Sequence, residues 1–282
     1  MKIALTGAGG QLGSFFSAYL KQSSNRFDGY KRHEWDIQSQ QDSNKFLSSG
    51  DYDVLINCAA YTDVEKAEIE QQSCFDINAH ALNHLSKICK KQGVMLVHFS
   101  TDYIFDGDSQ IPYQETDKPN PLNAYGASKL EGEQIIQASG CRFFIGRISW
   151  LFGGNDSGFT SKLENWRTNN KVLKISSDEV STPTYTGHVP NFIIPAIHKN
   201  LEGIFHLNNT GSCSRYEWAS YYAKQRNWTN TIIKPAPMSS FQMQAKRPCY
   251  SVLCNKRFQV ICKTSIPHWE LAVNQSIQRP SS

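Results

Sequence analysis

The sequence predicts an α/β protein built on a doubly wound parallel sheet of Rossmann type, followed by a smaller C-terminal α/β lobe. Two observations lead to this fold class. A short apolar strand at the start of the chain runs into a glycine-rich turn and then a helix. Short apolar strands then alternate with helices up to about residue 152, as in consecutive βαβ units. We therefore assign residues 1–152 to a first domain and residues 153–282 mainly to the lobe, which can return elements to that domain.

The glycine-rich turn points to a dinucleotide site. The predicted strand covers residues 2–6 and the predicted helix covers residues 12–20. Gly7 and Gly10 lie between them and Gly13 lies at the start of the helix, in G-x-x-G-x-x-G spacing. Gly7 allows a tight turn, Gly10 lets the backbone approach a pyrophosphate, and Gly13 lets the helix pack closely. Phosphates would bind at the helix N-terminus, where free N–H groups favour anions. A glycine-rich turn without a ligand is the alternative.

The stretch after the second strand bears on which dinucleotide would bind. That strand should end near Tyr30, and Lys31 and Arg32 follow with no acidic residue before Glu34. An acidic residue here suits the ribose 2′-OH of NAD, whereas a basic residue suits the 2′-phosphate of NADP. The sequence therefore favours NADP, with NAD left possible because the same residues could be a solvated loop.

Further cofactor contacts are expected along the chain. Asp36 and Ile37 lie a few residues on, where they could flank an adenine ring. The third strand, residues 53–57, runs into small residues that would let a cofactor ribose pass near the backbone, namely Cys58, Ala59 and Ala60. We predict one helix over residues 65–89, with Ile69 among its apolar positions. Asn78 on that helix either supports the active-site hydrogen bonding or is exposed.

Candidate catalytic residues follow the fourth strand, residues 94–99. Thr101 lies at its C-terminal end, where open parallel sheets bind ligands. The helix predicted over residues 124–138 carries Tyr125 and Lys129 four residues apart, so both leave one face. An ammonium close to a phenol lowers its pKa and makes it a usable acid or base near neutral pH. The alternative is a packed tyrosine beside a solvated lysine.

The remaining elements are shorter and more varied. A strand over residues 141–148 completes the alternating pattern. The later strands are predicted at residues 172–175 and 203–207, and the later helices at residues 159–166, 189–198 and 215–225.

Composition excludes several classes of protein. The 282 residues are 39% hydrophobic and 19% charged with a net charge of +4, and their longest basic run is too short for a nucleic-acid surface. No apolar run approaches the about 20 residues of a membrane span, and no signal peptide is evident, so we expect a cytoplasmic protein. None of the eight cysteines forms a C-x-x-C pair, so free thiols and no metal are expected.

Five stretches together carry a family resemblance. They are residues 7–13 (GAGGQLG), 57–62 (NCAAYT), 100–107 (STDYIFDG), 119–126 (PNPLNAYG) and 247–248 (RP). In order and spacing they resemble the corresponding stretches of the dTDP-4-dehydrorhamnose reductases, a family of the extended short-chain dehydrogenase/reductase superfamily. The resemblance covers this chain from residue 1 to about residue 270.

The resemblance implies an activity and a role for each matching residue. The family uses NADPH to reduce the C4 ketone of dTDP-4-dehydro-L-rhamnose, giving dTDP-L-rhamnose. Tyr125 would donate the proton, Lys129 would hold the nicotinamide ribose and lower the pKa of Tyr125, and Thr101 would orient the carbonyl. Gln11 and Leu12 would join the glycines in binding the cofactor. The matching substrate positions are Thr62, Thr101, Asp102, Tyr103, Trp150 and Arg247, with Trp150 alternatively a core residue.

Three departures from the family pattern affect the expected partners and substrate. Some members form a dimer bridged by magnesium, but Phe15 stands where one acidic ligand would be, and a phenyl ring cannot bind this cation. We therefore expect a monomer or weak homodimer and no metal-bridged dimer. Tyr250 and Cys254 replace an amide and a carboxylate. Glu179 and Ser181 replace glutamine and glycine, and these changes leave the identity of the sugar open.

Two other functional classes remain as alternatives. One is a non-catalytic NADP-binding subunit resembling the regulatory subunit of methionine adenosyltransferase, against which the intact Thr101, Tyr125 and Lys129 argue. The other is a sugar-nucleotide epimerase or dehydratase. Dehydratases of the superfamily carry an acidic pair after the threonine, whereas here Asp102 is followed by Tyr103.

Overall fold

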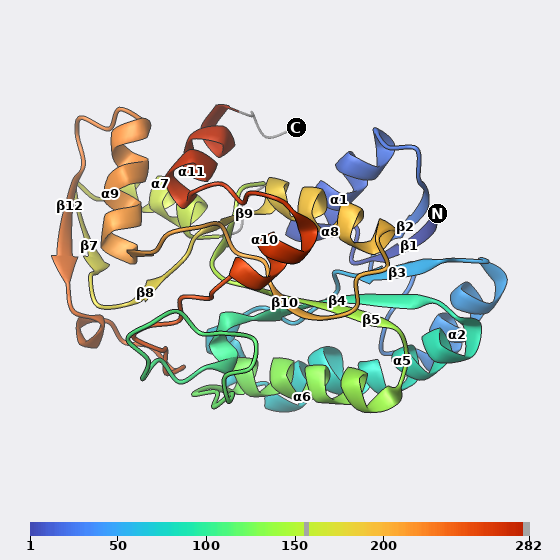
Figure 1. Ribbon diagram of the computed structural model, residues 1–282. Helices are drawn as coiled ribbons and strands as arrows, with labels where there is room; N and C mark the ends of the chain where they lie inside the picture. The colour runs from blue at the N-terminus through green and yellow to red at the C-terminus, as the bar shows by residue number, and fades with distance from the viewer. Residues whose placement is uncertain (155–157, 279–282) are drawn as a thin grey trace.

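A six-stranded parallel sheet lies at the centre of the computed structural model, which describes residues 1–154 and 158–278 (Figure 1). Every neighbouring pair in this sheet is parallel. In spatial order the strands are β10 (Gly203–His206), β5 (Phe143–Ile148), β4 (Met95–Thr101), β3 (Val54–Asn57), β1 (Lys2–Thr6) and β2 (Arg26–Tyr30). The chain winds outward from β1 to β2 and then from β3 in the other direction. The predicted doubly wound fold is therefore confirmed, with its switch point between β1 and β3.

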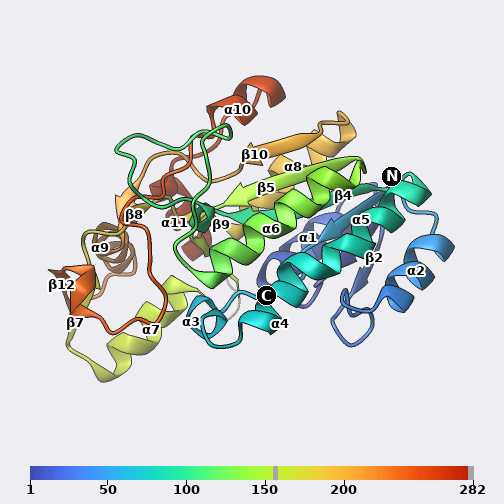
Figure 2. The same ribbon diagram turned by 90° about the horizontal axis from the view of Figure 1, so that it is seen from below.

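Helices cover both faces of this sheet, as Figures 1 and 2 show. One face carries α1 (Gln11–Lys21), α8 (Val189–His198) and α10 (Lys256–Cys262), and the other carries α2 (Gln40–Ser49), α5 (Ala81–Gln92) and α6 (Ala124–Ser139). Side chains alternate along each strand, so Ile3 and Leu5 pack under α1 and α8 whereas Ala4 faces the α5 side. Burial on both faces explains why these strands are continuous apolar runs.

A second, smaller layer of structure lies beyond the carboxyl ends of the strands. Its core is aromatic and includes Trp150, Phe152, Trp218 and Trp269. The helices are α7 (Phe159–Asn169), α9 (Arg215–Gln225) and α11 (Trp269–Gln278). The strands pair as β7 (Val172–Ser176) with β12 (Ile232–Ala236), β6 (Leu151–Phe152) with β9 (Thr184–Tyr185), and β8 (Val180–Ser181) with β11 (Cys213–Ser214). Because α8 and β10 pack with the central sheet, the C-terminal half contributes to both layers; a domain boundary at residue 152 stays a prediction.

One predicted element is wrong. The helix expected over residues 65–89 is divided into α3 (Val64–Ala67), α4 (Gln71–Phe75), a π-helical turn over Asp76–His80, and α5. Ile69, one of the apolar positions of the expected helix, lies between α3 and α4 and is 76% exposed. The π-helical turn packs against α6 at Gly132, where an added Cβ would lie 2.3 Å from the Asn78 carbonyl oxygen. Contact with α6 therefore overrides the apolar periodicity of this segment.

Two further findings concern the chain as a whole. Within the described ranges, no helix combines the length and apolarity that crossing a membrane requires. The eight cysteines are free, and four of them, Cys74, Cys89, Cys141 and Cys213, are buried.

The sheet and α6 are joined by a buried ion pair that gives a stability prediction. Arg147 donates to Glu133 from Nη2 at 2.7 Å and from Nε at 3.0 Å, and both side chains are at most 4% exposed. Glu133→Ala should lower the free energy of unfolding by about 3–5 kcal/mol, because it leaves the guanidinium buried without a partner. Chemical denaturation measures this change.

The exposed pair between Arg142 and Glu202, which are 46% and 44% exposed, provides the matched control. Glu202→Ala should cost about 1 kcal/mol or less, since exposed ion pairs contribute little. Equal losses in the two variants would contradict the assignment of the Glu133–Arg147 pair as a structural link.

Candidate active site

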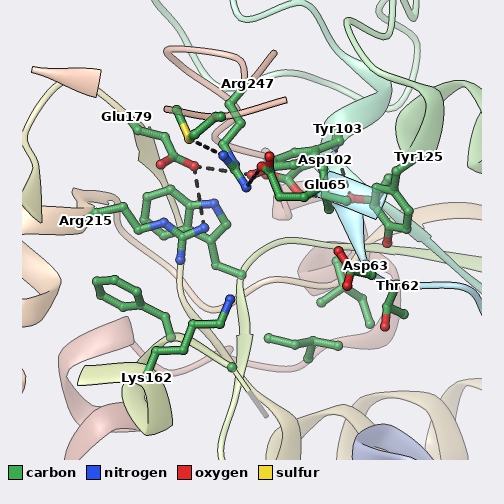
Figure 3. A pocket seen from close by; sticks show the side chains of 18 of the residues that line it. Thr62, Asp63, Glu65, Asp102, Tyr103, Tyr125, Lys162, Glu179, Arg215 and Arg247 are labelled. Carbon is green, nitrogen blue, oxygen red and sulfur yellow. Dashed lines mark hydrogen bonds and ion pairs between the residues drawn. The ribbon is translucent and has the colours of Figure 1, made fainter. Parts of the chain in front are cut away.

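A cavity of about 1040 Å³ lies at the carboxyl ends of the central strands, between the sheet and the aromatic lobe. Its walls come from the glycine-rich turn, the ends of β3 and β4, the start of α6, and the lobe. In Figure 3, Tyr125 and Thr62 lie to one side of it and Arg215 and Lys162 to the other. Thirteen predicted site residues line it, namely Gly10, Gln11, Leu12, Cys58, Ala60, Thr62, Thr101, Asp102, Tyr103, Tyr125, Lys129, Trp150 and Arg247.

The glycine-rich turn has the geometry of a phosphate cradle. Gly7 adopts a φ of +67°, and a Cβ there would lie 2.7 Å from the backbone of Cys58 and Ala59. A Cβ at Gly13 would lie 2.1 Å from the Gly7 carbonyl oxygen, so the helix start packs directly on the turn. The first turn of α1 has neither an acidic residue nor a side-chain cap. The N-terminus of this helix, where the helix dipole favours negative charge, can therefore receive an anion.

Two buried polar atoms in the cavity wall also point to a ligand. Ser100 Oγ and Trp150 Nε1 are among eight buried side-chain atoms of the described residues that have no hydrogen-bond partner, and both residues line the cavity. Buried polar groups are ordinarily paired, so a bound molecule is the natural partner. The turn and these atoms together fit a dinucleotide lying across the ends of β1, β3 and β4.

The residues predicted near the adenosine end lie outside the cavity wall. Lys31 and Arg32 follow β2 and are exposed, and a Cβ at Gly9 would lie 3.4 Å from Lys31 Cγ. Lys31 therefore extends beside the glycine-rich turn. The Asp36 carboxylate accepts from the Gln38 N–H, and Ile37 is buried.

Asn78 supports the site from behind. It is fully buried; its Oδ1 accepts from the Tyr61 N–H at 2.9 Å, and its Nδ2 donates to the Tyr61 carbonyl at 3.0 Å and to Ser128 Oγ at 3.0 Å. These bonds fasten the segment after Ala59 and Ala60 to α6. Asn78 is absent from the cavity wall, so the structure places it as a support for the loop that borders the cavity.

Thr101, Tyr125 and Lys129 meet at the cavity wall. Thr101 and Lys129 are 5% and 2% exposed, while Tyr125 keeps partial exposure toward the cavity. Burial raises the pKa of Tyr125, hydrogen bonding by Thr101 lowers it, and Asp102 and Cys74 raise it further. Burial lowers the pKa of Lys129 to about 8, against the opposite effect of Glu133. The pKa of Tyr125 is therefore raised overall in this state, and a lowering of it by Lys129 stays a prediction.

Comparison with known proteins agrees with this geometry. The sequence model of the RmlD substrate binding domain matches residues 1–281. A crystal structure of dTDP-4-dehydrorhamnose reductase from Clostridium acetobutylicum has a TM-score of 0.94 and 33% identity, covering 99% of both chains. That from Bacillus anthracis, in complex with NADP, has a TM-score of 0.94 and 30% identity over 98% of both chains. A dTDP-4-keto-6-deoxy-D-glucose reductase of Streptomyces niveus is 28% identical over 96% of this chain and 95% of its own.

The chain belongs to the RmlD family. The family resemblance carried by the sequence motifs is thereby confirmed, and the chain is an oxidoreductase of the dTDP-4-dehydrorhamnose reductase type.

Several residues of the RmlD-family cavity were not predicted from the sequence. Lys162, Glu179 and Arg215 come from the lobe; Glu179 Oε1 lies 3.5 Å from Arg215 Nη2 and accepts from the Tyr103 hydroxyl at 3.3 Å (Figure 3). Arg215 also stacks on Trp150, with 3.6 Å from Cζ to the ring centroid. The sequence distinguishes Glu179 only as a departure from the family pattern, and nothing local distinguishes Lys162 or Arg215.

The substrate positions implied by the resemblance come from different parts of the fold. Thr62 and Tyr103 face the cavity from the sheet domain. Trp150 both lines the cavity and stacks on Trp218 in the lobe core, so the two interpretations of this residue are compatible. Arg247 Nη2 lies 2.6 Å from Glu65 Oε1, which joins the C-terminal segment to α3.

The remaining family departures lie away from the cavity. Tyr250 packs against the cluster around Ile104 and Phe105, and the Cys254 N–H donates to the Tyr113 carbonyl. Phe15 packs edge-on against Tyr185 with ring centroids 5.8 Å apart. Among the described residues, no group of three or more His, Cys, Asp or Glu side chains is placed to hold a metal ion. The oligomeric state stays a prediction.

Asp102 gives a prediction about pH. Burial raises the pKa of Asp102 to about 6, although hydrogen bonds from Ser251, Ser181 and Thr101 lower it. The folded protein thus retains a proton that the unfolded chain loses near 3.8, so the free energy of unfolding should fall as pH rises from about 4 through 6. In the wild type this fall in the free energy of unfolding should be on the order of 2–3 kcal/mol, and Asp102→Asn should abolish it. Chemical denaturation at several pH values across this range measures both.

Asp106→Asn is the matched control, because hydrogen bonds outweigh desolvation and place the pKa of Asp106 below its ordinary value. Its effect should appear only below about pH 4. An unchanged slope in Asp102→Asn would show that Asp102 is already ionised throughout this range.

Proposed function

We propose that the protein uses NADPH to reduce the C4 ketone of dTDP-4-dehydro-L-rhamnose to dTDP-L-rhamnose in the cytoplasm. The meeting of Thr101, Tyr125 and Lys129 at the cavity wall, next to the glycine-rich turn, is the observation that carries this proposal. An intact set of this kind favours catalysis over a purely regulatory role. Two reductases of similar structure, from Clostridium acetobutylicum and Bacillus anthracis, support the same reaction class.

The cofactor would lie across the switch point of the sheet. Gly10 and the N-terminus of α1 would receive its pyrophosphate, Cys58–Ala60 would border its ribose, and Lys129 would hold the nicotinamide ribose. Bound NADPH supplies the hydride for the reduction. Lys31, exposed beside Gly9, would receive a 2′-phosphate.

Tyr125 would donate the proton to the substrate oxygen. Its raised pKa keeps the phenol protonated near neutral pH, which is the form that a proton donor needs. Thr101 would orient the same carbonyl through its hydroxyl. After the proton leaves, a positively charged Lys129 would stabilise the phenolate.

The wall of the cavity on the lobe side, opposite Tyr125, suits an anionic nucleotide. Four basic side chains, Lys162, Lys174, Arg215 and Arg247, line it and could pair with a diphosphate. Phe159 and Trp166 lie on the same wall and offer aromatic surface to a nucleobase. The cavity volume of about 1040 Å³ is large for a single small substrate and suits cofactor and sugar nucleotide together.

A related 4-keto-6-deoxysugar is the second candidate substrate. Glu179 places a carboxylate in the cavity where the family commonly has an amide, and the Streptomyces niveus relative is named for a different dTDP-4-keto sugar. The deciding experiment measures NADPH consumption with dTDP-4-dehydro-L-rhamnose and with dTDP-4-keto-6-deoxy-D-glucose in parallel, and identifies each product. Turnover of the first substrate to dTDP-L-rhamnose would support the proposal, and turnover of the second alone would replace it.

Tyr125→Phe tests the proton donor. Removing the hydroxyl should lower kcat by about 10²–10⁴-fold, the usual contribution of a general acid, while NADPH still binds. Steady-state kinetics and cofactor fluorescence measure the two effects. Tyr222→Phe is the control, because its hydroxyl contacts Glu164 in the lobe, and it should retain activity. Native turnover in Tyr125→Phe would remove the proposed role.

Lys31→Ala tests the choice of cofactor. If Lys31 receives the 2′-phosphate, its loss should reduce the preference for NADPH over NADH by about tenfold or more, as for a lost charge-assisted hydrogen bond. The ratio of kcat/KM for the two cofactors is the measurement. Lys21→Ala at the far end of α1 should leave the ratio unchanged. An unaltered ratio in Lys31→Ala would assign the phosphate to another residue.

A further inference from the structure

A row of buried polar side chains crosses the sheet and ends at Lys129. Thr6, Asn57 and His98 are neighbours in the strand register of β1, β3 and β4. The alternation of each strand places all three on the face covered by α5 and α6, and they are at most 1% exposed. Thr6 Oγ1 donates to Asn57 Oδ1 at 2.8 Å, Asn57 Nδ2 lies 3.2 Å from His98 Nδ1, and His98 Nε2 lies 3.0 Å from Lys129 Nζ.

The orientation of the Asn57 amide is fixed by the backbone. Its Oδ1 accepts from the Ala59 N–H at 3.1 Å, and an N–H can only donate. Asn57 therefore presents its NH₂ group to His98, so His98 Nδ1 must be the unprotonated acceptor. A neutral imidazole then carries its hydrogen on Nε2, directed at Lys129.

An ammonium group cannot complete this row. It has three donors and no acceptor, so a charged Lys129 would oppose one N–H with another. A neutral amine has a lone pair that can accept from His98 Nε2–H. The four groups therefore form a consistent chain of hydrogen bonds with Lys129 uncharged.

We propose that His98 positions Lys129 and stabilises its neutral amine form in the cofactor-free protein, and that cofactor binding releases Lys129 from this contact, with uptake of up to one proton from solvent where the amine is neutral. The second half rests on the proposed function, in which a charged Lys129 holds the nicotinamide ribose and stabilises the phenolate of Tyr125. His98 thereby opposes the charging of Lys129 until the cofactor is present.

The other titratable groups around Lys129 are consistent with this state. Glu133 from α6 faces Lys129, but its carboxylate is paired with Arg147. Tyr125 from α6 and Cys74 from α4 have pKa values raised mainly by burial, so both are neutral near pH 7. Burial is the largest cause that lowers the pKa of His98 well below its ordinary value, and it keeps the imidazole neutral without any charge on Lys129.

The first test uses the cofactor-free wild-type protein. Nitrogen-15 NMR of labelled histidine distinguishes the two neutral tautomers, and carbon-13 NMR of labelled lysine follows the titration of Lys129. We expect His98 with its hydrogen on Nε2 and a Lys129 pKa at least about one unit below the ordinary value of about 10.4. A hydrogen on Nδ1, or an ordinary Lys129 pKa, would overturn the proposal.

Two variants change the row in defined ways. Asn57→Asp keeps the acceptor for Ala59 but presents a second carboxylate oxygen to His98, which moves the hydrogen to Nδ1 and leaves Nε2 as an acceptor for an ammonium. Its Lys129 pKa should rise by about one to three units. His98→Gln offers a carbonyl oxygen without adding charge and should also raise the pKa of Lys129.

His84→Gln is the control, because His84 is half-buried and bound to the Ile37 carbonyl, and it should leave the pKa of Lys129 unchanged. Unchanged values in Asn57→Asp and His98→Gln would refute the role of His98.

The second half is tested with NADP⁺ alone. Calorimetric titrations in buffers of different ionisation enthalpy, above the Lys129 pKa of about 8, count the protons taken up on binding. We expect close to one proton per NADP⁺ in the wild type and much less in Asn57→Asp. Binding without uptake would overturn this half and leave the proposed function intact. Failure to bind NADP⁺ would overturn the proposed function and the linked uptake together, while the NMR results would still decide the role of His98.

Discussion

Burial of the Lys129 amino group is the constraint on which the rest of the active site depends. Removing a cation from water is costly unless it is paired or neutralised. Here the inward face of α6 is mostly small or polar, with Gly126, Ser128, Lys129, Gly132 and Glu133 beside the single large apolar residue Ile136. Specific polar contacts with β4 and β5 therefore hold this helix in place. An ordinary amphipathic helix is held mainly by the packing of an apolar face.

The glycines of α6 allow these contacts to form. A Cβ at Gly126 would lie 2.1 Å from the Tyr103 carbonyl oxygen, and one at Gly132 would lie 2.3 Å from the Asn78 carbonyl oxygen. The close approach at Gly132 brings the π-helical turn against α6, and Asn78 then reaches Tyr61 and Ser128. Such turns occur often at functional sites, since they aim a side chain that a regular helix would turn elsewhere.

The sequence predicted what depends on neighbours along the chain. The six strands of the sheet and the glycine-rich turn are local patterns, and Tyr125 and Lys129 share a helix face by spacing alone. The break of residues 65–89 was missed because it is imposed by α6, more than forty residues away. The pairing of His98 with Lys129 and that of Glu133 with Arg147 depend on strand register and helix docking. The charges that Lys162 and Arg215 bring to the cavity likewise require the lobe to be placed.

Asp102 shows how the lobe reaches the catalytic wall. Its Oδ2 accepts from Ser181 Oγ at 3.1 Å and from Ser251 Oγ at 2.5 Å, while Thr101 donates to its Oδ1 at 3.2 Å. The serine at position 181, where the family commonly has glycine, thus adds a hydroxyl to the carboxyl group next to Thr101. Tyr250 and Cys254, by contrast, contact residues behind the cavity. Changes in the lobe can therefore alter the electrostatics around Thr101 and Tyr125 without touching the sugar, because a buried carboxyl group transmits its hydrogen bonding to both neighbours.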